Sequence, residues 1–344
     1  MARAAKSKPA SNSDNEEKAR LIAALKFASV AIEKTDNSGL SEFITIAGHW
    51  LMARNETFAL GVQVDTDLEI SLHAEKFLAA LELCGDNFNL VQFSANELSI
   101  QSGNFRAVVP TLPPTSVAEF SSPDAPAGQL SAEILEAFRV CGKACAGKGS
   151  KVYHNSVLLQ ANTMQATNGA IAFEFWHGSP FPCPMGIPKK TVDALAKLGE
   201  PIAGFGFSDR SLTIYLSNGS FIKTRLMTEA WPTKLSELFD KHAGPHLRNQ
   251  PLWAGFVDAL GALAKFTKEN DTIVFHDNLV ATSEVADHAA ASYVVPGLPG
   301  GPKYSLAYWR IVAPFAVNIV LPKLKEEPLG FFCNNVRGLI LGKH

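Results

Sequence analysis

The feature of this sequence that most constrains its fold is an internal repeat. The stretch SANELSIQSGNFRAVVPTLPP (94–114) aligns with SDRSLTIYLSNGSFIKTRLMTEAWP (208–232), and Leu98 falls on Leu212 at an offset of 114 residues. Both stretches alternate apolar and polar residues around a small-residue turn, which is the pattern of a two-stranded β-hairpin. A chain with such a period is built from copies of one structural unit.

Each hairpin is preceded by a short helix and a strand, and the same order recurs a third time. The predicted helices are 72–84, 188–199 and 306–316, and the strands after them are 88–94, 202–208 and 317–321. The first half of each unit also starts with a predicted helix, at about 16–33, 130–145 and 252–266, followed by the alternating sequences EFITIAGHWLMA, KVYHNSVLLQA and DTIVFHDNLVATS. We therefore predict an α+β protein of three repeated domains, each made of two helix-plus-antiparallel-sheet halves.

Proline, serine and glycine concentrate between the copies, in TLPPTSVAEFSSPDAPAG (111–128) and DKHAGPHLRNQP (240–251), and these stretches are the predicted linkers. The start of the chain is polar and lacks the apolar core of a signal peptide, which predicts a disordered tail. The predicted division is a tail over residues 1–15 and domains over residues 16–122, 128–241 and 250–344.

Composition supports a folded protein with a sizeable core, because 47% of the 344 residues are hydrophobic and 19% are charged. No apolar run reaches the roughly 18 residues that a membrane span needs. The five cysteines are odd in number and scattered, which argues against a disulfide framework and predicts a cytoplasmic protein. A net charge of -2 predicts no overall attraction to nucleic acid, although a basic surface on one side is compatible with it.

The stretch GKACAGKGS (142–150) has the spacing of a phosphate-binding P-loop, G-x-x-x-x-G-K-[ST]. A P-loop follows a strand and opens a helix, because the loop amides and the helix N-terminus bind phosphate together. Here an amphipathic helix comes first, with Ile134, Phe138 and Cys141 on one face. Gly149 also replaces the required Ser or Thr. We interpret the glycines as the end of a helix followed by a basic loop.

Enzyme and metal-site signals are weak in this sequence. Cys141 and Cys145, with His154 and His177, suggest zinc, but structural zinc sites use tighter ligand pairs on turns. Buried free thiols are therefore the favoured interpretation, and no metal or other cofactor is predicted. Hydrolase and dinucleotide-binding signatures are absent from the sequence. A hydrolase or nucleotidyl enzyme built from dispersed residues stays an alternative, which loss of nucleotide turnover in Lys148→Ala would favour.

Three segments resemble the ring-shaped DNA sliding clamps of bacterial type, the beta subunit of DNA polymerase III. QATNGAIAFEF (165–175) resembles the A-T-D-G-H-R-L-A strand-turn-strand of the middle clamp domain, and IPKKTVDALAKL (187–198) resembles the start of that domain's second helix. SIQSGNFRAVVPTLPP (99–114) is similar to the hairpin that closes the first domain. The resemblance covers residues 17–344 in domain order, and the divergence suits a phage-encoded member that works in the host cytoplasm.

The resemblance implies a DNA polymerase processivity factor rather than an enzyme. Two chains would form a head-to-tail ring around duplex DNA, with helices on the inner face and sheets outside. A sliding clamp contacts phosphates without reading bases, so basic side chains are expected on the inner helices. The candidate DNA-facing residues are Lys18, Lys26, Arg139, Lys143, Lys148, Lys189, Lys197, Lys265, Lys268 and Arg310.

The resemblance also implies a groove into which the replicative polymerase and the clamp loader insert short apolar peptides. Asn168 stands where the family has Asp, and the tail GLILGKH differs from the family's ending, so the groove is either more apolar than usual or lost. A clamp-like interaction protein that never encircles DNA is a second alternative, marked by a stable monomer without length-dependent DNA retention. The candidate groove residues are Thr167, Gly169, Ala170, Ile171, Leu339, Ile340 and Leu341.

Overall fold

The computed structural model describes residues 12–33, 40–94, 96–114, 122–147, 151–267, 272–283, 289–324 and 326–343. The chain divides into two compact units. Unit 1 comprises Met1–Leu130 with Leu198–Arg225, and unit 2 comprises Ser131–Lys197 with Leu226–His344. Every strand pair in the described residues is antiparallel, which confirms the predicted α+β class. The division into three domains stays a prediction.

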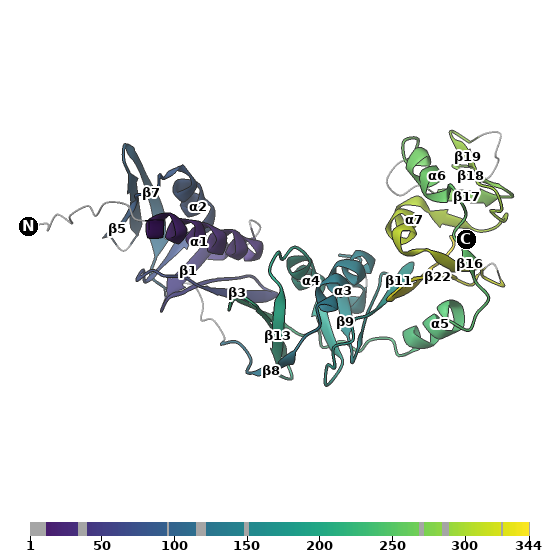
Figure 1. The fold of residues 1–344 in the computed structure, drawn as a ribbon, viewed down its shortest axis with the longest axis horizontal. Coiled ribbons are helices and arrows are strands. Elements are labelled where there is room, and N and C mark those ends of the chain that lie inside the picture. Colours follow the sequence, from purple (N-terminus) through teal and green to yellow (C-terminus); the bar gives the residue numbers. More distant parts are fainter. Residues whose placement is uncertain are drawn as a thin grey trace, which may run out of the picture. The chain divides into compact units, whose positions relative to one another are not determined.

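In its described residues, unit 1 has an eleven-stranded sheet and two α-helices (Figure 1). The helices are α1 (Asn12–Ala28) and α2 (Ala74–Leu83). The strand order is β5-β6-β7-β4-β1-β2-β3-β15-β14-β13-β8. The strands are β1 (Phe43–Ala47), β2 (Trp50–Arg54), β3 (Phe58–Gln63), β4 (Ile70–His73), β5 (Asn89–Ser94), β6 (Glu97–Ser102), β7 (Phe105–Leu112), β8 (Pro126–Gln129), β13 (Ile202–Phe207), β14 (Ser211–Leu216) and β15 (Phe221–Arg225).

Both predicted hairpins are confirmed, and both belong to this sheet. They are β6–β7 and β14–β15, with glycines of positive φ, Gly103 and Gly219, in their turns. Strand β15 also pairs with β3, and a Cβ at Gly61 of β3 would lie 2.5 Å from the ring of Phe221. Glycine at position 61 therefore makes room for the phenylalanine on the neighbouring strand.

Unit 2 contains an eight-stranded sheet, a four-stranded sheet and five α-helices among its described residues. The helices are α3 (Glu133–Cys141), α4 (Lys189–Ala196), α5 (Lys234–Ala243), α6 (Phe256–Leu263) and α7 (Leu306–Val312). The larger sheet contains β12 (Met185–Pro188), β9 (Ser156–Leu159), β10 (Thr163–Thr167), β11 (Ile171–Trp176), β23 (Val336–Ile340), β22 (Leu329–Cys333), β21 (Asn318–Val320) and β16 (Gln250–Pro251), in spatial order. The smaller sheet contains β19 (Ser292–Val294), β18 (Leu279–Ala281), β17 (Thr272–His276) and β20 (Lys303–Ser305).

The predicted apolar face of α3 is confirmed by burial. In α3 the side chains of Ile134, Phe138 and Cys141 are all buried, and Val192 and Leu195 of α4 are buried as well. Helices α3 and α4 pack against each other, and Gly142 at the end of α3 lets the side chain of Val192 approach closely. The 3-10 helix Gly142–Ala144 follows α3 directly, so a helix and not a strand precedes the P-loop-like glycines.

Aromatic rings fill the core around α6 and α7. Phe256 meets Trp309 edge to face, with ring centroids 4.9 Å apart, and Phe275 and Tyr304 join the same cluster. Trp309 is fully buried, so this tryptophan packs in the core of unit 2.

Three local expectations differ from the structure. The segment KVYHNSVLLQA was expected to be strand throughout, but residues Val152–Asn155 form a 3-10 helix and only Ser156–Leu159 pair as β9. Helix α5 was not predicted, and its last four residues overlap the expected linker 240–251. Helix α1 begins at Asn12, inside the expected tail of residues 1–15; residues 1–11 lie outside the described part of the chain.

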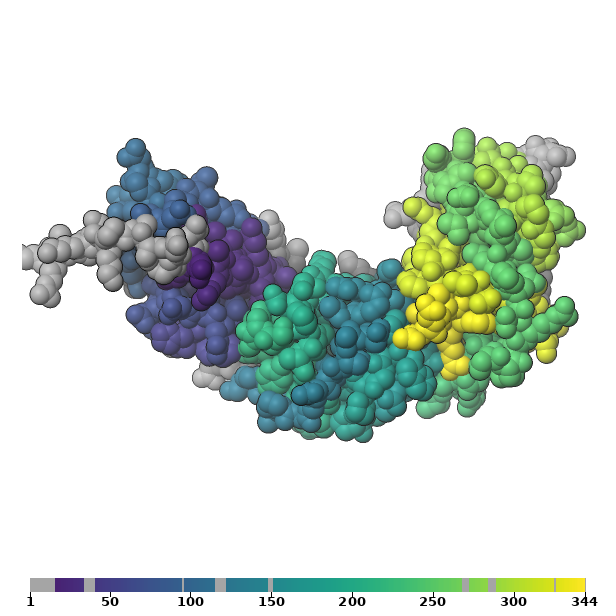
Figure 2. Space-filling model, in the orientation of Figure 1, coloured from purple at the N-terminus to yellow at the C-terminus, as the bar shows by residue number. Residues whose placement is uncertain are grey.

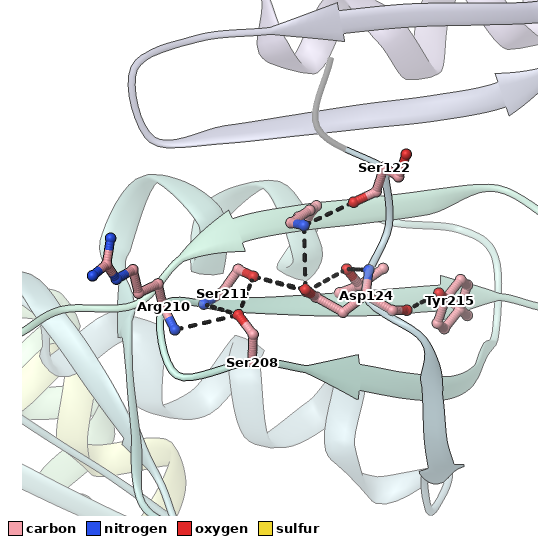
Figure 3. A network of polar contacts seen from close by, with 8 residues as sticks. Ser122, Asp124, Ser208, Arg210, Ser211 and Tyr215 are labelled. Atoms are coloured by element: carbon pink, nitrogen blue, oxygen red, sulfur yellow. Dashed lines mark hydrogen bonds and ion pairs between the residues drawn. The ribbon is translucent and has the colours of Figure 1, made fainter. Parts of the chain in front are cut away.

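The connector before β8 is fixed to unit 1 by a network of polar contacts around Asp124 (Figure 3). The carboxylate accepts hydrogen bonds from Ser211 Oγ at 2.9 Å and Thr213 Oγ1 at 2.8 Å, and it lies 3.2 Å from Lys223 Nζ. The hydroxyl of Tyr215 donates to the Asp124 carbonyl, and Lys223 Nζ donates to the Ser122 carbonyl at 2.7 Å. The described end of the predicted linker is therefore an ordered part of the sheet.

Candidate functional site

The basic side chains predicted to face DNA include a group on the paired helices α3 and α4. Arg139, Lys143 and Lys197 are exposed, and Lys189 is partly exposed. Two of these side chains already have acidic partners: Lys189 Nζ lies 2.7 Å from Asp193 Oδ1, and Arg139 lies 3.6 Å from Glu136. Lys143 Nζ instead lies 4.9 Å from the ring centroid of Phe315, a contact that leaves its charge uncompensated. Lys143 and Lys197 are therefore the stronger candidates for phosphate contacts in this group.

The candidates in unit 1 connect its two helices. Lys26 of α1 pairs with Glu82 of α2 at 2.9 Å, and Lys18 Nζ donates to the Cys84 carbonyl at the end of α2. Both side chains therefore have a structural role in addition to any contact with DNA.

Lys265 follows α6 and Arg310 lies on α7, and both side chains are exposed in unit 2. Lys148 and Lys268 lie outside the described residues.

The structure brings the predicted groove residues together. Ile171 of β11 pairs with Ile340 of β23, and the Leu341 amide donates to the Ala170 carbonyl at 2.8 Å. We refer to these four residues, together with Thr167, Gly169 and Leu339, as the strip. Most of the strip is buried, and among its side chains that of Leu341 is the large apolar one that remains exposed.

Asn168 preserves the turn between β10 and β11 despite the departure from the family pattern. Its Oδ1 accepts hydrogen bonds from the backbone amides of Ala170 and Ile171, each at 2.9 Å. An aspartate carboxylate would offer the same acceptor, because both residues form Asx turns. Gly169 has a φ of 89° and can hold this conformation without strain.

Helix α5 covers the sheet face next to the strip. Leu235, Phe239 and Ala243 of α5 form one buried cluster with Ala172 and Leu339 of the sheet. Figure 1 shows this helix beside the C-terminal strands, and contacts of α5 with both β22 and β23 agree with the view. In Figure 2 green atoms lie against the yellow atoms of the C-terminal end. One of the predicted groove residues, Leu339, is therefore covered by side chains of α5.

One arginine holds α5 to the sheet. Arg337 of β23 donates from Nε to Glu174 and from Nη1 to Asp240 of α5 at 2.7 Å. Burial alone would lower the pKa of Arg337, but the bonds to Glu174 and Asp240 raise it above its usual value. The guanidinium therefore stays charged, and Gln165 extends the network by donating to Glu174 at 2.7 Å.

An aromatic ledge next to the strip was missed at the sequence level. It consists of Tyr153, His154 and Trp231. The rings of Tyr153 and His154 meet edge to face at 4.6 Å, and Tyr153 lies 5.9 Å from Trp231. A Cβ at Gly169 would lie 3.2 Å from His154, which places the ledge against the strip. Burial and the nearby Lys151 charge lower the pKa of His154, so the ring is neutral at pH 7.

Trp231 also lines a pocket of about 310 Å³. Its walls come from β9, β10, β12 and the segment that leads into α5. The lining residues are Leu158, Gln160, Gln165, Pro184, Gly186, Met227, Glu229, Ala230, Trp231, Pro232, Thr233 and Ser236.

The described residues contain neither a membrane-spanning helix nor a metal-binding cluster. None of the helices there is both long and apolar enough to cross a membrane. No group of three His, Cys, Asp or Glu side chains in the same ranges is arranged to hold a metal ion. Cys141 and Cys145 are buried free thiols, and burial raises the pKa of Cys145 to about 12.

Comparison with solved structures identifies the fold. The chain superposes on the DNA polymerase sliding clamp of Bacillus subtilis with a TM-score of 0.78 at 13% identity, covering 95% of this chain and 98% of that chain. The DNA polymerase III subunit beta of Pseudomonas aeruginosa gives 0.74 at 14% identity, with coverage of 95% and 98%. The Helicobacter pylori beta clamp bound to a DNA ligase peptide gives 0.74 at 14% identity, with coverage of 95% and 99%.

No family model and no curated protein sequence matches the chain. The chain thus has the fold of bacterial DNA polymerase III beta clamps over nearly its whole length, with a strongly diverged sequence.

Proposed function

We propose that this protein is a DNA sliding clamp: two chains close head to tail into a ring around duplex DNA and tether replication proteins without catalysing a reaction. The observation that carries the proposal is the fold, which matches solved clamps over 95% of the chain. We expect the ring to work in the cytoplasm, with the replicative polymerase and the clamp loader as peptide-bearing partners.

Two sheet edges support the ring. Strand β5 ends the eleven-stranded sheet, and β19 ends the four-stranded sheet, among the described strands. Phe93 of β5 is 60% exposed and Val294 of β19 is 65% exposed. An exposed apolar edge strand is a pairing site unless something covers it. We propose that β5 of one chain lies against β19 of the next, which uses both edges in a closed dimer.

The helix charges support sequence-independent DNA contact. Lys143, Lys197, Lys265 and Arg310 are exposed on or directly after helices, and helix side chains of this kind contact phosphates without reading bases. Because the protein has a net charge of -2, its attraction to DNA must come from a basic surface on one side and not from its overall charge.

Topological retention tests the proposal. The protein is threaded onto linear duplex DNA, the ends are blocked with streptavidin, and the salt is raised until simple phosphate contacts dissociate. We expect protein to stay on blocked DNA and to leave open-ended DNA, and negative-stain images to show rings. Equal loss from both DNAs would contradict encirclement and favour a clamp-like protein that binds beside DNA.

A substitution in β5 tests the proposed pairing of β5 with β19. Phe93→Asp places a charge in the proposed interface, and we expect it to give monomers by light scattering. Val108→Asp is the matched control, because Val108 is 51% exposed in the same sheet on an inner strand, β7. Dimers that persist in Phe93→Asp would contradict the assignment of β5.

A further inference from the structure

The last residue of β11 is a tryptophan that the described residues leave largely uncovered. Trp176 is 59% exposed, whereas Phe173 and Phe175 of the same strand are buried on the opposite face of the sheet. The backbone is held at this point, because Trp176 is opposite Thr163 of β10 and its amide donates to the Asn335 carbonyl at 2.8 Å. A large aromatic side chain on a fixed backbone is a frequent anchor of protein interfaces.

Trp176 lies on the sheet face that α5 covers, beside an acidic flank of that helix. Side chains alternate along β11, so Trp176 shares its face with Glu174, two residues earlier. Glu174 and Asp240 are both bonded to Arg337. Glu237 precedes Asp240 by three residues and therefore lies on the same flank of α5. Three carboxylates share one guanidinium at this edge of the helix.

The carboxylates of α5 on this flank are accessible to a ligand. Asp240 is largely exposed, and its Oδ2 accepts no hydrogen bond from the part of the chain that the structure describes. Glu237 is exposed as well and has no ion-pair partner among those residues. Of the two lysines of α5, Lys241 is bonded to Glu327 at 3.4 Å, and Lys234 forms no ion pair with either carboxylate.

An arginine side chain complements this arrangement. Its planar guanidinium stacks on the face of an indole and at the same time donates hydrogen bonds to carboxylate oxygens. A lysine side chain has no planar group to stack. An acidic side chain would be repelled by Glu237 and Asp240.

The surface around Trp176 is separate from the strip. Ile171 of the strip and Trp176 are at opposite ends of β11, about 16 Å apart along the strand. Phe239 of α5 packs in one cluster with Ala172, between these two ends. The pocket that Trp231 lines includes neither Trp176 nor any residue of α5 beyond Ser236.

We propose that Trp176, Glu237 and Asp240 form a binding surface for an arginine side chain in a basic segment of a partner protein. The charge complementarity between the acidic flank and arginine carries the assignment, and the exposed indole supplies the contact area. The inference goes beyond the proposed function, because it adds a place of attachment that is independent of the strip. It does not depend on whether the chain encircles DNA.

The test uses the full chain and a fluorophore-labelled probe peptide, acetyl-Ala-Arg-Ala-Arg-Ala-amide, in an anisotropy titration at low salt. We expect saturable binding, about threefold weaker binding of the lysine analogue, and no binding of the glutamate analogue. Trp176→Ala should weaken binding about tenfold, because the stacking surface is lost. Glu237→Gln should weaken it about threefold through the loss of one carboxylate.

Glu133→Gln is the matched control, because Glu133 is an exposed carboxylate on α3 of the same unit and its loss changes the net charge equally. Leu341→Ala is the control on the strip. Both substitutions should leave the affinity for the probe unchanged. Unshifted indole N–H resonances of the buried Trp253 and Trp309 verify that each variant is folded.

Unchanged affinity in Trp176→Ala, or equal losses in Glu133→Gln and Glu237→Gln, would overturn the proposal. A Trp176 indole resonance that shifts with protein concentration in the absence of peptide would also overturn it, because the surface would then belong to a contact with a second copy of the chain. The titration needs neither DNA nor a ring, so its failure is distinguishable from failure of the clamp function.

Discussion

Arg337 bridges two acidic residues that lie 66 positions apart, Glu174 on the sheet and Asp240 on α5, with Nη1 2.7 Å from Asp240 Oδ1. The two acidic partners differ in their exposure to solvent. The side chain of Glu174 is 11% exposed and that of Asp240 is 68% exposed. Solvent screens the outer pair, so most of the stabilisation comes from the inner one.

We expect Arg337→Met to lower the free energy of unfolding by about 2 kcal/mol, because it leaves the buried Glu174 without its cation. Asp240→Asn is the control, and we expect it to cost less than about 1 kcal/mol. Urea denaturation of both variants measures the difference. Equal losses would show that α5 is held by the outer ion pair instead.

In unit 1, the polar network around Asp124 predicts the same contrast between a buried carboxylate and an exposed one. The carboxylate of Asp124 has hydroxyl donors in Ser211 and Thr213 and an ammonium partner in Lys223. We expect Asp124→Ala to cost about 2–3 kcal/mol, since three donors lose their acceptor at once.

Asp209→Ala is the matched control for this prediction. Its side chain is 87% exposed and lies 3.8 Å from Arg210, so we expect a change within about 0.5 kcal/mol. Chemical denaturation of the two variants measures both changes in the free energy of unfolding. A small effect of Asp124→Ala would mean that the connector is held by backbone pairing of β8 alone.

The sequence predicted those elements whose side-chain period was long and regular. Helix α3 repeats its apolar residues over two turns, and the β14 hairpin alternates around a small-residue turn, so local pattern and final packing agree. The pairing of strands that come from different copies of the repeat could not be predicted from such local patterns. The contact of β15 with β3 joins residues more than 150 positions apart, and only the glycine at position 61 hints at it.

Helix α5 shows why part of the site was missed. Leu235, Phe239 and Ala243 have helical spacing, but Pro245 and Gly244 directly after them favoured a linker. The apolar face becomes recognisable only when the sheet that it covers is known. Tyr153 and His154 were read as strand because an aromatic pair before an apolar run fits a strand pattern as well as a 3-10 turn.

Buried His177 predicts a loss of stability in mild acid. Burial lowers its pKa, and the carbonyls of Thr163 and Gln160 oppose this only in part. Its Nδ1 accepts the Ser179 amide at 3.0 Å, which requires the unprotonated nitrogen. The unfolded chain, with a histidine pKa near 6.5, therefore takes up the proton first as the pH falls.

We expect the free energy of unfolding to be constant above about pH 6.5 and to fall as the pH drops from there towards the folded-state pKa. His177→Asn should flatten this slope, whereas His246→Gln, at an exposed position, should not. His154 and His242 also have lowered pKa values, so part of the slope remains in the variant. Denaturation curves between pH 5 and pH 8 check the sign, and a rise in stability on acidification would contradict it.

Salt dependence separates the lysines that contact DNA from those that hold the protein together. Lys143 and Lys197 are exposed, whereas Lys26 is paired with Glu82 at 2.9 Å. Each phosphate contact contributes about 0.9 to the slope of log affinity against log salt on duplex DNA. We expect Lys143→Gln and Lys197→Gln each to reduce the slope by about that amount, and Lys26→Gln to reduce it by much less. Fluorescence anisotropy with a labelled duplex over a potassium chloride series measures all three. A larger loss for Lys26→Gln would mean that Glu82 releases its partner to the DNA, and that phosphate outcompetes the carboxylate on this helix pair.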